Sequence, residues 1–209
     1  RIGLVNGLFA TAAGIGGITV IEAFKTPCET KLSLVTTGQQ GDVMKESITC
    51  AKTIAWNIIP NAIKNKIIKD IKDNVIQPFG IHIHCPEAAT PKDGPSAGAA
   101  ITLAMVSLLT NFPVNNKIAM TGEIDLNGAV HTIGGLELKI DGGKWAGVEK
   151  ILVPKGNQQD LDIIKLKNPT VLDDIEIIII ETIWDVLEHA LIIPKKEKSK
   201  IKFNNYSSV

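Results

Sequence analysis

Hydrophobic and polar positions divide the chain into short strand-like runs and longer helix-like runs. Three apolar runs separated by glycine turns open the chain, with the sequences "RIGLVNGLFAT", "GITVIEAF" and "KLSLVTTG". Short runs of this composition are typical of strands, so we expect an antiparallel sheet. The glycines at positions 14, 16 and 17 lack the spacing of a nucleotide-binding loop and therefore indicate turns.

The period of the pattern changes after residue 41. Apolar residues recur at intervals of three and four from Val43 to Ile58, and Pro60 ends the pattern, which predicts an amphipathic helix. Residues 61–76 mix lysines and carboxylates with isoleucines, which indicates a solvated helix or loop. A partner-specific insertion is the alternative interpretation of this segment.

The second half of the chain alternates predicted strands and helices. "FGIHIHC" at 79–85 reads as a half-buried strand, with Ile81, Ile83 and Cys85 inward. The pair Asn127 and Gly128 is a strong hairpin signal. Helices are expected over 96–109, after Gly134-Gly135, from Asn157 onwards and over 182–191, with strands at "KILVP" and "IEIIII". Such an order favours an α+β or α/β layered fold.

Composition narrows the class of protein. The 209 residues, 44% of them hydrophobic, suffice for one compact domain. The 22 basic and 22 acidic residues cancel, which gives no electrostatic reason to expect binding to nucleic acid or to an anionic membrane. The cysteines at 28, 50 and 85 form no CxxC pair, so neither a disulfide framework nor a zinc site is expected, and a reducing compartment fits best.

The sequence also bears on membrane segments and on the two ends of the chain. The longest aliphatic run, at 177–180, is too short to span a bilayer, and we expect no membrane segment or leader. A start at Arg1 without a methionine suggests a piece of a longer protein with partner domains elsewhere. Residues 194–209 are rich in lysine and polar side chains, so a disordered C-terminal tail is expected.

The stretch "EAATPKDGPSAGAAITLAMVSLL" at 87–109 carries the first candidate chemistry. It sets Ser96 behind Gly94 and Pro95 at the start of an apolar helix. Main-chain N–H groups at a helix N-terminus can hold an oxyanion, which suits a nucleophile. Serine is equally a favoured N-cap, so the stretch alone leaves both roles open.

A serine nucleophile needs a base, either a histidine or a lysine kept neutral by burial. The four histidines show no pattern that singles one out. Lys92 lies in a polar loop and should be charged, whereas Lys139 lies among Leu136, Leu138 and Ile140. Burial of that kind lowers the pKa of a lysine, so Lys139 is the better candidate.

Two other features near this stretch have simpler explanations. His82 and His84 lie two residues apart and could ligate a metal, but no third ligand is evident, and we expect no metal site. The thiol of Cys85 could act as a nucleophile, but an inward strand position favours packing in the core.

The motifs together have a family resemblance. "GDVMKES" (41–47), "IHIHCPEAATPKDGPSAG" (81–98), with "PKDGPSAG" at 91–98, "AMTGEI" (119–124) and "GGLELK" (134–139) resemble the proteolytic domain of ATP-dependent Lon proteases, from Arg1 to about Ile193. The resemblance implies an α+β domain over 1–193, similar to the ribosomal protein S5 domain 2-like fold, with mixed sheets and flanking helices.

The resemblance also implies partners and a compartment. It implies an intracellular serine endopeptidase of the cytoplasm or mitochondrial matrix, which works in a homo-hexamer on unfolded polypeptides delivered by an AAA+ ATPase domain. ATP and Mg are expected on that missing domain, because no Walker A sequence occurs here, and no cofactor is expected in this one.

Residue by residue, the resemblance implies a Ser-Lys dyad. Ser96 matches the nucleophile, Lys139 the general base and Thr121 the residue that holds the lysine, with main-chain N–H groups around Asp93 and Ser96 receiving the oxyanion. The remaining supporting positions are the side chains of Asp93, Glu22 and His84.

The sequence departs from the family pattern at three places. Ala88 replaces a glycine before the signature, Gly142 and Gly143 replace alanines in the helix of Lys139, and Phe9 and Ala10 stand where an aromatic is shifted or missing. Helix glycines cost roughly 1 kcal/mol each relative to alanine, so this helix should be short or depend on packing. Alternative functions are a catalytically silent ring-forming scaffold and an S5-like nucleic-acid-binding module.

Overall fold

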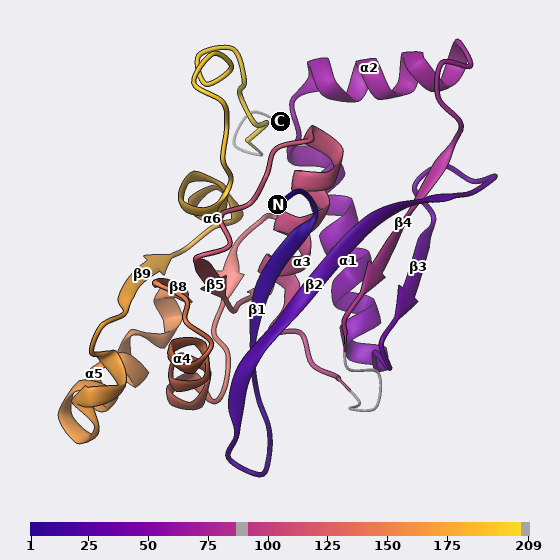
Figure 1. Cartoon of the computed structure of the whole chain (residues 1–209). Coiled ribbons are helices and arrows are strands. Elements are labelled where there is room, and N and C mark those ends of the chain that lie inside the picture. The colour runs from indigo at the N-terminus through magenta and orange to yellow at the C-terminus, as the bar shows by residue number, and fades with distance from the viewer. Residues whose placement is uncertain (87–91, 206–209) are drawn as a thin grey trace.

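The computed structural model describes residues 1–86 and 92–205, and it contains a mixed seven-stranded sheet with helices on both faces (Figure 1). The strand order is β3-β4-β2-β1-β5-β8-β9, and β6 and β7 form a separate hairpin. The expectation of a mixed sheet with flanking helices is confirmed. The strands are β1 (Leu4–Ala10), β2 (Gly16–Pro27), β3 (Leu34–Thr37), β4 (Phe79–His84), β5 (Ile118–Met120), β6 (Glu123–Ile124), β7 (Val130–His131), β8 (Lys150–Pro154) and β9 (Glu176–Ile180).

Strand directions differ in part from the prediction. The first two runs form an antiparallel pair, β1 and β2, as expected. The third run, β3, pairs in parallel with β4 rather than joining an antiparallel sheet. The reason is the connection: two helices lie between β3 and β4 in the chain, and a helical crossover returns the chain in the same direction.

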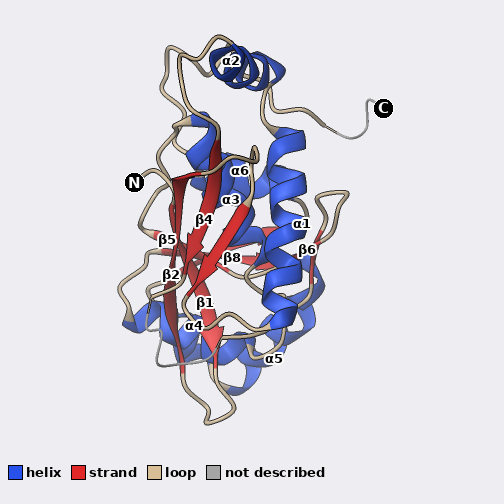
Figure 2. Cartoon of the chain, turned by 90° about the vertical axis from the view of Figure 1, so that its right-hand side faces the viewer, coloured by secondary structure: helices blue, strands red, loops and turns tan. Residues whose placement is uncertain are grey.

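Six α-helices occur in the described part of the chain: α1 (Asp42–Ile58), α2 (Asn61–Lys72), α3 (Gly98–Thr110), α4 (Leu136–Trp145), α5 (Gln158–Lys167) and α6 (Ile183–Ala190). Helices α1 and α3 contact each other and cover one face of the sheet, while α4 covers β1 and β2 on the other face (Figure 2). Two hydrophobic clusters result, one beneath α1 and α3 and one beneath α4. No helix among residues 1–86 and 92–205 is long and apolar enough to cross a membrane.

Helices α1 and α2 follow the predicted pattern. Met44, Ile48, Ala51, Ile54, Ala55 and Ile58 of α1 are buried, whereas Val43, in the first turn, is 45% exposed. Helix α1 ends at Ile58, two residues before Pro60, and α2 begins at Asn61, directly after it. Helix α2 has no buried residue, which agrees with the expected solvated segment.

The C-terminal segment is more ordered than the sequence suggested. Ile201 and Phe203 pack against the core, and the side-chain amide of Asn204 donates hydrogen bonds to the carbonyl oxygens of Asn57 and Ile59 at 3.0 and 2.9 Å. The expected disordered tail therefore does not describe residues 201–205. Two apolar side chains and the side-chain amide of Asn204 thus dock a lysine-rich stretch on the end of α1.

Glycines bring α4 unusually close to the β1–β2 hairpin. A Cβ at Gly16 would lie 1.7 Å from the carbonyl oxygen of Leu138, and a Cβ at Gly142 would lie 2.1 Å from the nitrogen of Gly17. Gly14 alone of the opening triplet serves a turn, with φ of +79°. The assignment of the whole triplet to turns is thus wrong, and α4 depends on packing as expected. The departure at Ala88 lies outside the described residues.

Candidate active site

Ser96 lies in a turn immediately before α3 rather than at its N-cap. Helix α3 begins at Gly98, and Ala97 occupies the N-cap position without a side-chain cap. The N–H of Gly98 donates to the carbonyl oxygen of Pro95 at 3.0 Å, which closes the turn. The cap role suggested by the sequence is therefore wrong: the hydroxyl of Ser96 caps nothing, and among residues 1–86 and 92–205 it has no hydrogen-bond partner.

A cavity of about 140 Å³ opens beside Ser96. Its other walls come from the end of β1, from the start of α1 and from the loop before Ser96. They comprise Leu8, Phe9, Ala10, Thr11, Thr19, Met44, Lys92, Asp93, Gly94 and Ala97. The nucleophile candidate thus faces a small, partly apolar space, which suits a side chain of a bound polypeptide next to the reacting bond.

Asp93 fixes the loop that leads to Ser96. Its Oδ1 accepts hydrogen bonds from the backbone N–H groups of Met44, at 3.0 Å, and of Gly94, at 2.9 Å. Met44 is in the first turn of α1, so the carboxylate caps that helix and lies at its positive end. A Cβ at Gly41 would lie 2.4 Å from Cγ of Asp93, so any larger residue there would displace this carboxylate.

Lys139 is buried in the first turns of α4. It shares the buried face of α4 with Leu136 and Ile140, and the residue is 4% exposed. Burial lowers the pKa of Lys139 from 10.5 to about 8, because the charged amine loses its hydration. The Nζ amine donates one hydrogen bond, to Oγ1 of Thr121 at 3.1 Å. An amine with this pKa is neutral in a substantial fraction of molecules just above neutral pH.

Thr121 links Lys139 to the Ser96 turn. Its hydroxyl donates to the carbonyl oxygen of Ser96 at 3.2 Å, and the N–H of Gly122 donates to the same oxygen at 2.7 Å. A hydroxyl has a single hydrogen, so Thr121 accepts from Lys139 through a lone pair. The donated N–H then fixes the orientation of the amine, and the nitrogen lone pair points away from Thr121.

The structure brings Ser96, Thr121 and Lys139 together, although no hydrogen bond joins Oγ of Ser96 directly to Nζ of Lys139. The chain reaches this arrangement from three elements: the turn before α3, the residue after β5 and the first turns of α4. Backbone contacts join the first two of these elements, because the N–H of Ala99 also donates to the carbonyl oxygen of Gly122 at 3.0 Å.

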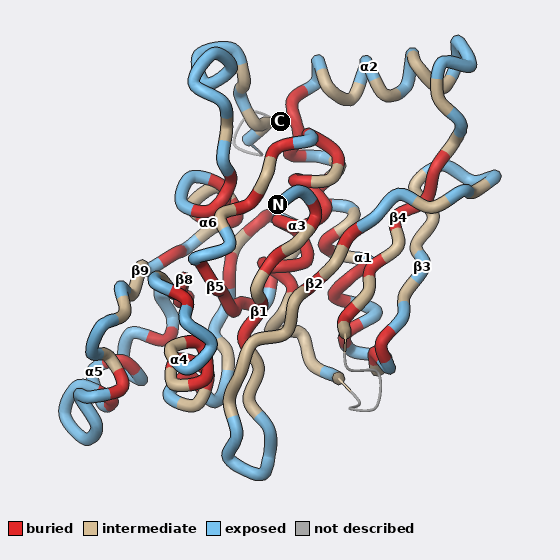
Figure 3. Tube along the Cα trace, in the orientation of Figure 1, coloured by how far each residue is buried: buried red, intermediate tan, exposed pale blue. Residues whose placement is uncertain are grey.

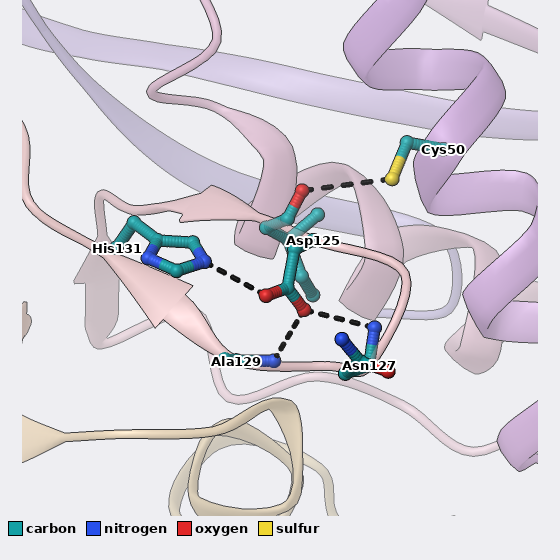
Figure 4. Close-up of polar contacts among 6 residues, drawn as sticks. Cys50, Asp125, Asn127, Ala129 and His131 are labelled. Atoms are coloured by element: carbon teal, nitrogen blue, oxygen red, sulfur yellow. Dashed lines mark hydrogen bonds and ion pairs between the residues drawn. The ribbon is translucent and has the colours of Figure 1, made fainter.

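The β6–β7 hairpin spans the chain between Thr121 and α4, and Asp125 closes it (Figure 4). One carboxylate oxygen accepts from the N–H groups of Asn127 and Ala129 at 2.8 and 3.0 Å, and the other pairs with Nε2 of His131 at 2.9 Å. Partial burial raises the pKa of Asp125, but the hydrogen bonds from His131 and the two backbone groups outweigh it, and the pKa lies below its ordinary value. The predicted Asn-Gly hairpin is confirmed, and its side-chain closure is additional.

Glu22 and His84 are not part of the lining of the Ser96 cavity. They face each other in the register of β2 and β4, both half-buried. Nδ1 of His84 and Nε2 of His82 share the hydroxyl of Thr37, at 2.7 and 2.8 Å. No metal-binding cluster of His, Cys, Asp or Glu occurs in the described ranges. Cys85 is fully buried, and burial raises the pKa of its thiol, which makes it a poor nucleophile.

Sequence reasoning missed the capping role of Asp93 and its close contact with Gly41. Both depend on the approach of the signature loop to the start of α1, 49 positions away in the chain. Motif spacing contains no signal for such a contact, apart from the presence of a carboxylate and of a helix start that offers no cap of its own.

The chain matches the family described as Lon protease (S16) C-terminal proteolytic domain over residues 1–193. It belongs to this family. It is 43% identical over 192 residues to the Lon protease homolog of Acanthamoeba polyphaga mimivirus, which covers 89% of this chain and 18% of the relative. It is 43% identical to the Lon protease of Campylobacter jejuni over 196 residues, or 92% of this chain and 24% of the relative. For the Lon protease of Clostridioides difficile the identity is 44% over 192 residues, with shares of 92% and 23%.

Membership identifies the chain as a serine peptidase domain of the Lon family. The chain spans only about a fifth to a quarter of the length of these relatives.

Proposed function

We propose that this domain hydrolyses peptide bonds of unfolded polypeptides with Ser96 as nucleophile and Lys139 as general base. The observation that carries the proposal is the buried amine of Lys139, which is bonded to Thr121, the residue that also binds the Ser96 carbonyl oxygen. A buried amine with a pKa of about 8 can accept a proton near neutral pH, which an exposed lysine cannot do.

The mechanism is acyl transfer. Neutral Lys139 takes the hydroxyl proton of Ser96 while Oγ attacks the carbonyl carbon of the peptide, and main-chain N–H groups around Asp93 and Ser96 stabilise the oxyanion. Lys139 then gives the proton to the departing amine, and water hydrolyses the acyl-enzyme. Thr121 connects the Lys139 amine to the backbone carbonyl oxygen of Ser96 and not to its hydroxyl, and catalytic hydrogen bonds often tighten only with substrate bound.

The rest of the proposed activity belongs to the longer protein. We propose that the domain works in a homo-hexamer joined to an AAA+ ATPase, with ATP and Mg bound outside this chain, since its 209 residues contain no Walker A sequence. The proposed compartment is the cytoplasm or the mitochondrial matrix, which suits three cysteines without a disulfide framework.

A fluorophosphonate probe tests the assignment of the nucleophile. The probe should label the chain at Ser96, and Ser96→Ala should abolish both labelling and peptide cleavage while circular dichroism stays unchanged. Cys85→Ala is the control and should retain both. Absence of labelling in the assembled, full-length enzyme would favour the silent scaffold.

Substitution of the lysine tests the base. Lys139→Ala and Lys139→Arg should each lose cleavage, the second because a guanidinium keeps its proton at working pH. The rate of the unsubstituted enzyme should rise with pH up to about 8 as Lys139 loses its proton. Substantial cleavage by either variant would overturn the role of Lys139.

A further inference from the structure

A second cavity lies at the far end of α1 from Ser96. It has a volume of about 310 Å³ and is formed by α1, α2, the β2–β3 loop and the start of β4. The lining consists of Lys31, Leu32, Trp56, Ile67, Ile68, Ile71 and Phe79. We call this cavity the α2 groove. Met44, beside Ser96, and Trp56 are separated along α1 by about 18 Å at about 1.5 Å per residue, so the groove is distinct from the catalytic cavity.

The α2 groove is apolar, although it lies on a solvated helix. No residue of α2 is buried, as the tan and pale blue tube of α2 in Figure 3 shows. Ile67 and Ile71 pack partly against the core, whereas Ile68 is 46% exposed at the groove. Six of the seven lining residues are apolar, and two of these are aromatic. A concave apolar lining of this kind suits a bulky side chain of a bound partner.

Lysines surround the α2 groove while the chain as a whole is neutral. Lys64 and Lys72 lie four residues before and after Ile68, so they share its helix face. Lys31 lines the groove from the β2–β3 loop. Nζ of Lys25 lies 4.6 Å from the centre of the Phe79 ring, which adds a further positive charge at this edge.

Carboxylates offset only part of this charge. Asp70 is already paired with Lys66 at 2.7 Å, and the two other carboxylates close in the sequence, Glu29 and Asp73, are fewer than the four lysines Lys25, Lys31, Lys64 and Lys72. Lys64 donates to the carbonyl oxygen of Asn57 at 2.8 Å, a contact that fixes the amine without neutralising it. The groove therefore has a positive rim around an apolar floor.

From this combination we infer that the α2 groove binds an acidic polypeptide segment through one bulky apolar side chain. The apolar residue enters between Trp56 and Ile68, and the neighbouring carboxylates pair with Lys31, Lys64 and Lys72. A polyanion without an apolar group would leave the floor uncovered, and an apolar peptide without carboxylates would leave the lysines unpaired. The surface thus selects for both features in one partner.

The binding is tested on the full chain with a synthetic peptide in which one leucine is flanked on both sides by glutamates. Binding should change the fluorescence of Trp56, and the change should disappear in Trp56→Phe while the peptide still binds. Control peptides replace the leucine by serine or the glutamates by glutamines. Each control should bind about tenfold more weakly, because one half of the recognition is missing.

Matched variants locate the site. The double variant Lys64→Gln and Lys72→Gln should weaken binding by about three- to tenfold, whereas Lys66→Gln with Lys69→Gln, which removes the same charge from other sides of α2, should leave it nearly unchanged. Ile68→Glu should abolish binding, and Leu166→Glu on α5, a residue 85% exposed, is its control. Cleavage of a short uncharged peptide should be the same in all of these variants, which separates this site from the catalytic one.

Three results would overturn the inference. One is equal weakening by the two lysine double variants, since the effect would then be net charge alone. The second is unchanged binding in Ile68→Glu. The third is tighter binding of a single-stranded DNA oligomer than of the peptide in competition for Trp56, which would assign the groove to nucleic acid.

Discussion

Replacement of Lys139 by methionine keeps an unbranched side chain in the buried site but removes the amine. We predict that Lys139→Met is inactive and yet more stable than the unsubstituted protein at pH 7. Below pH 8 the lysine is charged in both the folded and the unfolded states, and the folded state bears the full cost of burying that charge. The methionine side chain bears no such cost.

The pKa of Lys139 gives the size of the effect. Its fall from 10.5 to about 8 corresponds to a cost of about 3 kcal/mol, at about 1.4 kcal/mol for each pKa unit. Loss of the hydrogen bond to Thr121 returns about 1 kcal/mol, because Thr121 still donates to the Ser96 carbonyl oxygen. The net gain in the free energy of unfolding at pH 7 is therefore about 2 kcal/mol.

The dependence on pH distinguishes this cause from improved packing. Between pH 8 and 10.5 the unfolded state binds more protons than the folded state, so the stability of the unsubstituted protein rises with pH in that window. The advantage of Lys139→Met should accordingly shrink to nearly zero by pH 10.

Urea unfolding at pH 7 and pH 10 measures both values. Lys144→Met, on the same helix but only partly buried, is the control and should show no such gain. A Lys139→Met variant that is less stable at pH 7, or whose advantage is the same at both values, would refute the reasoning.

Three further predictions concern the elements around the dyad. Gly142→Ala should lower the free energy of unfolding by about 1–3 kcal/mol and reduce cleavage, because its Cβ would collide with the backbone of β2, whereas Gly143→Ala, which meets only side-chain atoms, should cost much less in thermal unfolding. Asp93→Ala should lower the free energy of unfolding by about 0.5–2 kcal/mol through loss of the α1 cap, whereas Asp93→Asn keeps an oxygen that can accept the hydrogen bond and is the reference. Equal stability of the two variants would contradict the capping role. Thr121→Val should lower kcat more than it raises KM, since the hydroxyl orients the base; equal cleavage by this variant would exclude that role.

Much of the fold could be predicted because its helices and strands have strong periodic patterns. Helix α1 begins at Asp42 and ends before Pro60 as its apolar spacing indicates, and α5 begins directly after Asn157. The alternation of Ile81, Ile83 and Cys85 with the histidines identified β4 and its buried side correctly. Side-chain periodicity reports which face of an element is buried, and these elements each have one clear buried face.

Strand partners and tertiary approaches could not be predicted in the same way. The parallel pairing of β3 depends on the helices that follow it, and Gly16 is required by a backbone 122 positions later in the chain, at Leu138. Docking of Asn204 onto the end of α1 depends on carbonyl groups that only the folded helix presents. Such contacts are set by packing between distant segments, about which local composition contains little information.

At the candidate site, the sequence supplied the residue types and the structure supplied their connections. Burial of Lys139 could be anticipated from its apolar neighbours, and the structure confirms that burial. The Ser96 turn could not, because a serine after Gly94 and Pro95 is as compatible with a cap as with a free hydroxyl. The distinction depends on where α3 begins, which differs by two residues from the expected start at 96.

The Thr121 hydroxyl has a single hydrogen, so it accepts a hydrogen bond from Lys139 and donates one to the carbonyl oxygen of Ser96, and these roles cannot be exchanged. The hydrogen is committed to a carbonyl oxygen, which is far too weak a base to keep a proton, so nothing can be relayed through Thr121. Every proton that Lys139 gains or loses must then cross the opposite side of its amine. Because Lys139 is only 4% exposed, the nucleophile, the departing amine and water must all approach its Nζ from the side that faces away from Thr121.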